Sequence, residues 1–285
     1  LEIPAGRTIR DGLAALVDKS MVRCVAAPDE GAQRFRLLQT LRDYALERLV
    51  EQGEAYAAAR RHAGYARWLA TSAGAGLNGT DPLPWLARLD AEEAEVRGAL
   101  AWSLRAGEPE LGLEIASSML AHWLSRGHLT EGRRWIRQLL AVPSDGPAIV
   151  RGRALRVAAR LASLQGDRVE AHALAEESLA IARAAGDGVE IARTLLLLAS
   201  DEDEDAEARI AESLAGFRAA GDLSGVANVH MRLGNRAFAA GNYLAARAKY
   251  ERSLVIRRAA GDNWNIHHVI NNLGLAAHAL GEIDE

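Results

Sequence analysis

A tetrapeptide that recurs at nearly constant spacing constrains the fold of this chain more than any other feature. Ala-Ala-Gly-Asp occurs at 184–187, 219–222 and 259–262, so successive copies begin 35 and 40 residues apart. The dipeptide Ser-Leu, which starts at Ser178, Ser213 and Ser253, recurs with the same two spacings. Because independent markers share one register, the chain is predicted to repeat a structural unit, as helical solenoids do.

Each unit is predicted to be a pair of amphipathic helices, called A and B here. In the clearest copy they cover 226–240 and 244–260, with a turn at Gly241-Asn242 between them, since glycine tolerates the left-handed conformation that ends a helix. The shorter spacing of 35 implies that the second unit has lost five residues near 201–205, so its helix A should be short. The recurring serines are expected to be small spacers between helices, and Ala159 and Gly234 should be tightly packed within their own units.

Upstream of residue 144 the repeat is less regular. Three helices are predicted, over 85–105, 111–125 and 129–141, and the segment 142–147, rich in Pro and Gly, is the clearest boundary. The first fifty residues are predicted to form a helix, a two-stranded hairpin and a second helix, at 11–19, 21–26, 34–38 and 40–52. We therefore expect an all-α, TPR-like superhelix with a partial winged-helix domain at its start. Its parts would be residues 1–52, the C-terminal part of the winged helix; 53–143, a helical arm; and 144–285, the repeats.

Composition narrows the class of protein. Alanine, leucine, arginine and glutamate dominate and only 7 of the 285 residues are proline, which favours helices. The formal net charge of −4 does not suggest a polyanion binder. The one cysteine, Cys24, has no internal partner, and no apolar run is long enough to span a bilayer. We expect a soluble cytoplasmic protein, a piece of a longer polypeptide, with no cofactor.

Two resemblances follow from these motifs. Leu233-Gly234, Gly241, Tyr243, Ala246 and Tyr250 stand at the spacings of the tetratricopeptide repeat (TPR). Six further segments resemble the bacterial STAND regulators, signal-transduction ATPases related to the MalT-like and LuxR-type large transcription factors. These segments are LVDKSMV at 16–22, FRLLQTLRDYA at 35–45, RHA at 61–63, WLARL at 85–89, ALAW at 99–102 and GHLTEGRRW at 127–135.

The STAND resemblance implies a function. In that family a nucleotide-binding module and a winged helix precede a helical arm and a TPR sensor. This chain contains no Gly-x-x-x-x-Gly-Lys-Ser/Thr loop, so ATP hydrolysis would belong to a module outside it. We expect a non-catalytic region that binds an inducer (a peptide, a protein or a small anionic molecule) and transmits that event to the upstream ATPase module of the same polypeptide. Neither nucleic acid nor a membrane is an expected partner.

Other motifs have plainer interpretations. Gly74-Ala-Gly76-Leu-Asn-Gly79 matches a dinucleotide fingerprint, but a predicted helix precedes it, so a flexible loop is expected. Asp201, Asp203, Asp205 and Glu212 have the spacing of a calcium loop, but Ala206 replaces the required glycine. His267 and His268 are expected to point apart and His122 and His128 to straddle a helix end, so no metal site is expected. The serines lack a partner base and no catalytic residue is expected.

A ligand-binding face is predicted on the A helices, which line the concave side of a TPR superhelix. The residues of this face follow i, i+3, i+4, i+7 spacing and lie beside the face that packs within the unit. They include arginines, amides and histidines, and no carboxylate. They are Arg153, Arg156, Arg160, Arg193, Asn228, Met231, Arg232, Asn235, His268, Asn271, Asn272 and His278. The acids of these units fall in B helices and loops, for example at Glu176, Glu177, Glu212 and Glu251. This pattern predicts a groove for an anionic or extended peptide-like ligand, with a solvated polar face as the plain alternative.

Two rival functions remain open from the sequence. The chain could be a constitutive TPR scaffold that joins two proteins without switching. It could also bind DNA through its first domain, where Arg7, Arg10, Lys19, Arg23, Arg34 and Arg36 supply positive charge.

Overall fold

The N-terminal helices and hairpin follow the predicted order. The computed structural model describes residues 8–26, 33–77, 79–199 and 205–282. Helix α1 (Ile9–Asp18) is followed by the antiparallel hairpin of β1 (Val22–Ala26) and β2 (Gln33–Leu37) and by α2 (Gln39–Glu51). Within these elements Val22 is buried, and many apolar side chains are exposed, including Phe35, Leu37 and Tyr44. The N-terminal part therefore has a thin core of its own.

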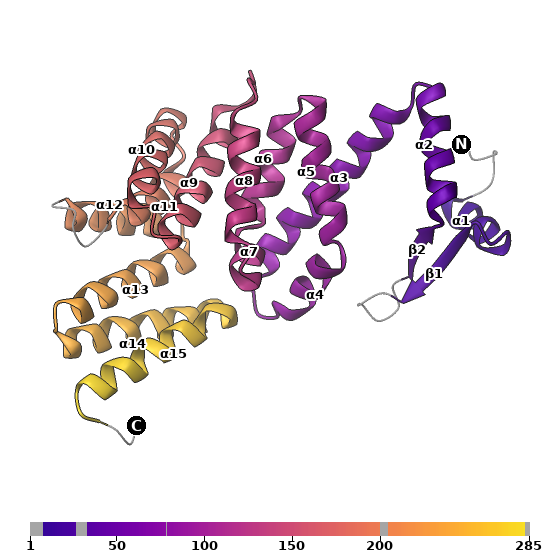
Figure 1. Ribbon diagram of the computed structural model, residues 1–285. Coiled ribbons are helices and arrows are strands. Elements are labelled where there is room, and N and C mark those ends of the chain that lie inside the picture. Colours follow the sequence, from indigo (N-terminus) through magenta and orange to yellow (C-terminus); the bar gives the residue numbers. More distant parts are fainter. Residues whose placement is uncertain (1–7, 27–32, 78, 200–204, 283–285) are drawn as a thin grey trace.

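Six helices form the middle of the molecule (Figure 1). They are α3 (Ala55–Gly76), α4 (Leu83–Ala91), α5 (Glu93–Ala106), α6 (Pro109–Ser118), α7 (Leu120–Arg126) and α8 (Leu129–Leu140). The largest hydrophobic core lies among them and extends to the next helix, with Leu69, Leu100, Ile115 and Ile136 almost completely buried.

Two predicted helices of this region are each broken in two. The expected helix 85–105 divides at Glu92, where the Arg34 guanidinium of β2 donates to the Ala91 carbonyl and pairs with the Glu92 carboxylate. The expected helix 111–125 divides at Met119, which is buried. Both predictions were wrong because the contacts at the breaks come from distant parts of the chain or from the core.

The predicted loop at Gly74–Gly79 was also wrong. Gly74 and Gly76 lie in the last turns of α3. A Cβ on Gly76 would come within 2.2 Å of the Trp85 ring, so this glycine permits a close approach of the Trp85 side chain and does not mark a flexible loop.

The C-terminal half consists of helix pairs that follow the sequence repeat. They are α9 (Ala148–Leu164) with α10 (Arg168–Ala185), α11 (Gly188–Leu198) with α12 (Ala206–Ala219), and α13 (Leu223–Ala239) with α14 (Tyr243–Ala260), followed by α15 (Asn263–Ala279). Each helix packs on the next, and smaller cores follow one another along the chain. The prediction of a short second helix A is confirmed, since α11 has 11 residues and α9 and α13 have 17 each.

One turn geometry recurs throughout this half. The glycine that ends each helix has a positive φ, between 66° and 82°, at Gly166, Gly186, Gly221, Gly241, Gly261 and Gly281. The residue after it donates its backbone N–H to a carbonyl five residues back, as Asp187 does to Ala182. Where that residue is Asp or Asn, its side chain then caps the next helix, as Asp187 does by accepting from the Glu190 N–H. The repeated Gly-Asx pair therefore ends one helix and starts the next.

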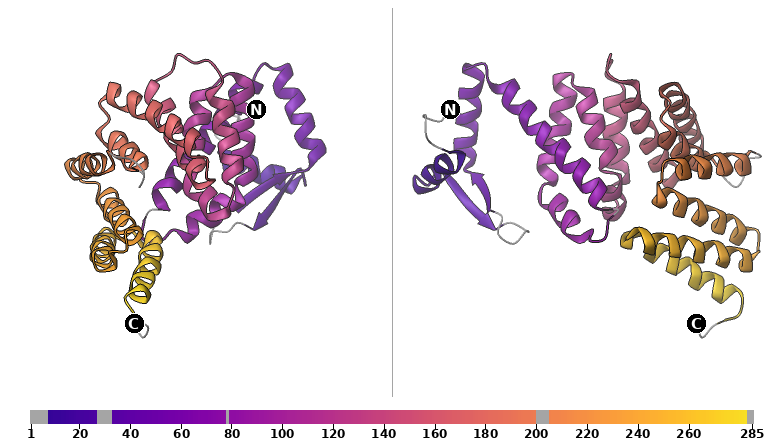
Figure 2. Two further views of the ribbon diagram at one scale, coloured as in Figure 1. Left: turned by 60° about the vertical axis from the view of Figure 1, so that its left-hand side comes forward. Right: turned by 180° about the vertical axis from the view of Figure 1, so that it is seen from behind.

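Helix α14 runs back toward the middle of the molecule, and α15 begins beside it (Figures 1 and 2). Asn263 Nδ2 donates to the Thr80 carbonyl at 3.0 Å, and Trp264 packs against the largest core. Residues that are 183 positions apart in sequence thus meet. No helix among the described residues is long and apolar enough to cross a membrane.

The serines and Ala159 lie where the repeat register requires. Ser178, Ser213 and Ser253 are buried in B helices and donate to carbonyls of the A helix of the same unit, at 2.8, 2.7 and 2.9 Å. Ala159 is fully buried in the core of the first unit. The interpretation of these residues as packing positions is confirmed.

Gly234 provides a test of the register. A Cβ there would come within 2.4 Å of the Tyr250 ring of the partner helix, so Gly234→Leu is expected to lower the free energy of unfolding by about 1–3 kcal/mol. Gly274 occupies the equivalent position in α15, where a Cβ meets nothing within 4 Å, and Gly274→Ala should leave stability unchanged or raise it by up to about 1 kcal/mol. Urea unfolding of both variants checks this, and equal effects would contradict the register.

Candidate functional site: the A-helix face

The predicted ligand-binding residues lie on α9, α11, α13 and α15, and we call their common surface the A-helix face. At one end of it three arginines surround one carboxylate. Glu190, whose side chain is 5% exposed, accepts from Arg156 Nε at 2.7 Å and pairs with Arg193 Nη1 at 3.2 Å. Arg153 Nε lies 3.9 Å from the same carboxylate. The charges of these arginines are therefore largely compensated within the protein.

Of the acids that reach this face, Glu190 on α11 departs from the prediction that acids fall in B helices and loops, whereas two others lie in connecting turns as predicted. Asp187 accepts from Arg153 Nη2 at 2.9 Å, and Asp222 pairs with Arg193 Nη2 at 3.4 Å. Both acids are helix caps that follow the turn glycines, and Glu190 lies three residues after Asp187. Their part in the repeat was visible in the sequence. Their pairing with arginines one unit earlier depends on how the units stack, which sequence spacing does not show.

This pairing recurs along the chain. An arginine of one unit reaches the acid at the start of a helix in the next, as Arg133 does to Asp167 at 2.7 Å and Arg97 to Glu131 at 2.6 Å. Arg133, and next the N–H of Glu170, hold the pKa of Asp167 below its usual value. The same side chain can thus cap its own helix and bind the neighbouring unit.

The middle of the face has a different electrostatic character. Arg160, in the C-terminal half of α9, is exposed and has no hydrogen bond or ion pair to the described residues. Desolvation by the surrounding protein, and next the positive charge of Arg232, lower the pKa of Arg160. Arg232, on α13, donates through Nε to the Ala199 carbonyl at 2.8 Å.

The short α11 lies between the units that carry Arg160 and Arg232, whose charges act on each other. These are the first and third units along the chain. Because α11 ends at Leu198, its final carbonyls are left for Arg232. The acids Asp201 and Asp203, considered above as calcium ligands, lie outside the described residues.

The far end of the face is a hydrogen-bonded amide cluster. Asn235 Oδ1 accepts from Asn272 Nδ2 at 3.0 Å and from the Tyr250 hydroxyl at 3.0 Å, and Asn272 also lies 3.7 Å from Met231 Sδ. Asn228 accepts from Arg257 Nη2 at 2.6 Å. The structure brings these residues together as predicted, although most are already engaged with one another.

The histidines of α15 differ from their prediction. The rings of His267 and His268 lie 3.9 Å apart and tilted by 43°, so the expectation that they diverge was wrong. Their exposed side chains can both turn toward the same side of the helix. Desolvation, and next His267, lower the pKa of His268. His268, Asn271 and His278 are exposed.

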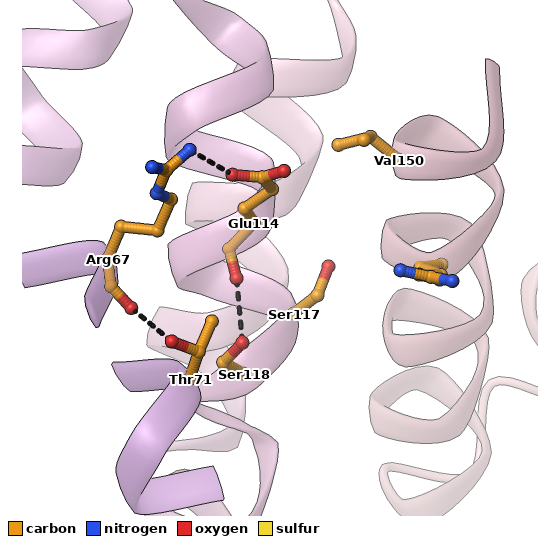
Figure 3. A pocket seen from close by; sticks show the side chains of 7 residues that line it. Arg67, Thr71, Glu114, Ser117, Ser118 and Val150 are labelled. Atoms are coloured by element: carbon orange, nitrogen blue, oxygen red, sulfur yellow. Dashed lines mark hydrogen bonds and ion pairs between the residues drawn. The ribbon is translucent and has the colours of Figure 1, made fainter. Parts of the chain in front are cut away.

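A polar hollow of about 310 Å³ adjoins the first end of the face (Figure 3). It lies between α3, α6 and α9 and is lined by Arg67, Thr71, Glu114, Ser117, Ser118, Val150 and Arg153. Arg67 pairs with Glu114 across it at 3.1 Å. Sequence reasoning did not find this hollow, because its lining comes from helices of the arm and of the first repeat.

The fold and this surface define an all-helical protein with a charged face along stacked helix pairs. No family model matches the sequence. The chain is 33% identical, over 98% of its length, to proteins of Mycobacterium bovis and Mycobacterium tuberculosis, each named "Putative HTH-type transcriptional regulator". It spans about a third (32%) of the length of these relatives.

One solved structure shares the arrangement of the helices. The crystal structure of BtubC (BKLC) from P. vanneervenii aligns with a TM-score of 0.50 and 19% sequence identity, over 68% of this chain and 85% of that one. At this identity the likeness concerns the fold alone.

Glu190 tests the charge compensation at the first end of the face. Glu190→Gln keeps the shape but leaves the arginines around it without their shared anion, and should lower the free energy of unfolding by about 2–3 kcal/mol. Glu212→Gln is the matched control, because its pair with Arg183 at 3.4 Å is half exposed on both sides and is worth less than about 1 kcal/mol. Urea unfolding that gives the two variants equal stability would contradict this account.

Proposed function

We propose that this chain is the arm and ligand-binding region of a STAND-type transcriptional regulator, and that its helix pairs are TPR repeats. The similarity to regulators about three times as long supports this proposal. In it, the chain catalyses nothing itself. It binds an inducer and transmits that event to an upstream nucleotide-binding module of the same polypeptide.

The uncompensated positive charge at Arg160 is the observation that supports an anionic ligand. A guanidinium can bind a carboxylate or phosphate with two parallel hydrogen bonds. Of the predicted arginines, Arg153, Arg156 and Arg193 are paired with carboxylates, whereas Arg160 has no such pair with any residue that the structure describes. The exposed Asn271 and His268 further along the face would bind the less charged parts of an extended ligand. We therefore place the inducer across α9, α13 and α15, with an acidic group at Arg160.

A route to the upstream module starts at the hairpin. Arg34 of β2 joins the N-terminal part to the break between α4 and α5. Around it, exposed apolar side chains such as Phe35, Leu37 and Leu38 offer a surface for a neighbouring module. Movement of the arm would then reach the module through this hairpin.

Two alternatives predict other results. A constitutive scaffold would bind its partners without any change at the contact between Asn263 and Thr80. A DNA-binding role for residues 1–52 would use the arginines near the hairpin, but Arg34 is turned to the arm and bound there. Arg7 lies outside the described residues.

Binding of acidic peptides tests the ligand site. A pool of fluorescent acidic peptides is titrated against the chain and its variants, with anisotropy as the readout. Arg160→Ala is expected to weaken binding about 10- to 100-fold, the worth of one bidentate charge-assisted contact. Arg160→Lys should restore part of it, because the charge remains but the fork is lost.

Arg183→Ala is the control, since it removes the same charge from the B helix α10, where Arg183 pairs with Glu212. If Arg183→Ala and Arg160→Ala weaken binding equally, binding is general electrostatics. If neither does, the ligand lies elsewhere.

The proposed division of labour gives a second test. The purified chain should hydrolyse no ATP, and any binding to duplex DNA should be weak and fall steeply as salt rises. Filter binding and a phosphate-release assay measure both. Tight, sequence-specific DNA binding at physiological salt would favour the winged-helix alternative.

A further inference from the structure

Three side chains of the arm converge on one point at which sequence spacing shows no motif. Glu93 lies in the first turn of α5, His122 on α7, and His128 is the residue before α8. One ligand atom from each lies within 4.8 Å of the others. The turn at Gly127, with φ of 72°, reverses the chain between α7 and α8 and so returns His128 toward His122. The ring centroids of the two histidines are 6.2 Å apart.

Each of the two histidines has a buried ring nitrogen that forms no hydrogen bond among the described residues. The His122 side chain is 1% exposed, and its Nδ1 has no hydrogen bond among the described residues. His128 Nδ1 is buried as well; it lies 3.1 Å from Glu93 Oε1 but does not form a hydrogen bond with it. Buried nitrogens without partners are costly. Side chains that bind one metal ion lie close together without hydrogen bonds between them, because each lone pair points to the ion.

A second layer of contacts holds the first histidine in the orientation that a metal requires. His122 Nε2 is 3.0 Å from Asp90 Oδ1, and Asp90 is itself bound by Arg126 Nε at 3.0 Å. Donation of Nε2–H to this carboxylate leaves Nδ1 with a lone pair that accepts no hydrogen bond from the described residues. A carboxylate behind a ligating imidazole fixes its tautomer and raises its basicity in metal sites. Arg97 positions Glu93 by donating to its Oε1 at 3.0 Å.

The local charge favours a cation. The carboxylates of Asp90, Glu93 and Glu131 face the guanidiniums of Arg97 and Arg126, which leaves one negative charge when the histidines are neutral. Two imidazoles and a carboxylate form a donor set that zinc prefers, with distances of about 2.0–2.2 Å. Donor atoms around a tetrahedral ion then lie about 3.3 Å apart, so the cluster would contract by up to about 1.5 Å at its widest.

We propose that Glu93, His122 and His128 form a divalent transition-metal site suited to Zn²⁺. The ion joins α5, α7 and the start of α8 and leaves its fourth position for water or an external ligand. The site lies close to the break at Glu92 where Arg34 of the hairpin is docked, so the ion stiffens the arm beside that contact. This proposal does not depend on the ligand of the A-helix face.

Zinc binding to the chain without a tag tests the proposal. After removal of metals with EDTA and dialysis, Zn²⁺ is titrated in competition with a chromophoric chelator. One equivalent is expected to bind, and a hundredfold excess of Zn²⁺ over its dissociation constant should raise the melting temperature by about 5 °C. Co²⁺ provides an independent readout on the unmodified chain, as the intense visible bands of tetrahedral coordination are expected. If the chain with Co²⁺ shows no more than the weak spectrum of aqueous Co²⁺, the proposal is overturned.

Variants assign the ligands. His128→Gln and Glu93→Gln should each weaken Zn²⁺ binding more than tenfold, and Asp90→Asn, which acts through His122, about tenfold or more. His62→Gln is the control. His62, on α3, forms a surface pair at 2.9 Å with Glu95, which lies on α5 as Glu93 does. Melting in EDTA shows that each variant is folded. If His62→Gln weakens binding as much as His128→Gln, or if His128→Gln binds zinc like the parent, the site does not exist as proposed.

Discussion

The helix turn made by a left-handed glycine and the capping acid after it is the interaction on which the C-terminal half depends. The glycine ends one helix, and the acid starts the next by accepting a hydrogen bond from the backbone N–H three residues further on. In three turns the same acid also accepts a hydrogen bond from an arginine of the preceding unit. The pairs are Arg133 with Asp167, Arg153 with Asp187 and Arg193 with Asp222. One dipeptide thus sets both the length of each helix and its contact with the neighbouring unit.

This double use of the caps shapes the candidate site. Because two caps, Asp187 and Asp222, and Glu190 pair with Arg153, Arg156 and Arg193, the face is nearly neutral at its first end. Arg160, near the end of the short α11, is the exception, since it has no ion pair to a described residue. The five residues that distinguish the second unit from the third therefore change the surface as well as the helix length. The polar hollow between α3, α6 and α9 extends this surface toward the arm.

Features of the structure could be predicted from the sequence where the interactions that produce them join residues close together in the chain. Helices α9 to α15 were predictable because glycine, capping acid and apolar period act within a few residues, and Gly234 against Tyr250 is a contact within one unit. The breaks at Glu92 and Met119 were missed because Arg34 and the core act from far along the chain. The pairing of Glu190 with three arginines and the meeting of Glu93 with His122 and His128 were missed for the same reason. Residue types on a face were predictable, but their partners were not.

The central claim is that an anionic ligand lies on the A-helix face, and hydrogen exchange with the tightest-binding peptide of the acidic pool tests it most directly. Amide exchange of each helix is compared with and without saturating peptide. The account predicts slower exchange in the C-terminal half of α9 and in α13 and α15, with little change in α10, α12 and α14. A switch also predicts altered exchange at 79–82 and 261–265, where the last helix meets the arm. Protection confined to the B helices or to residues 8–51 would contradict the account.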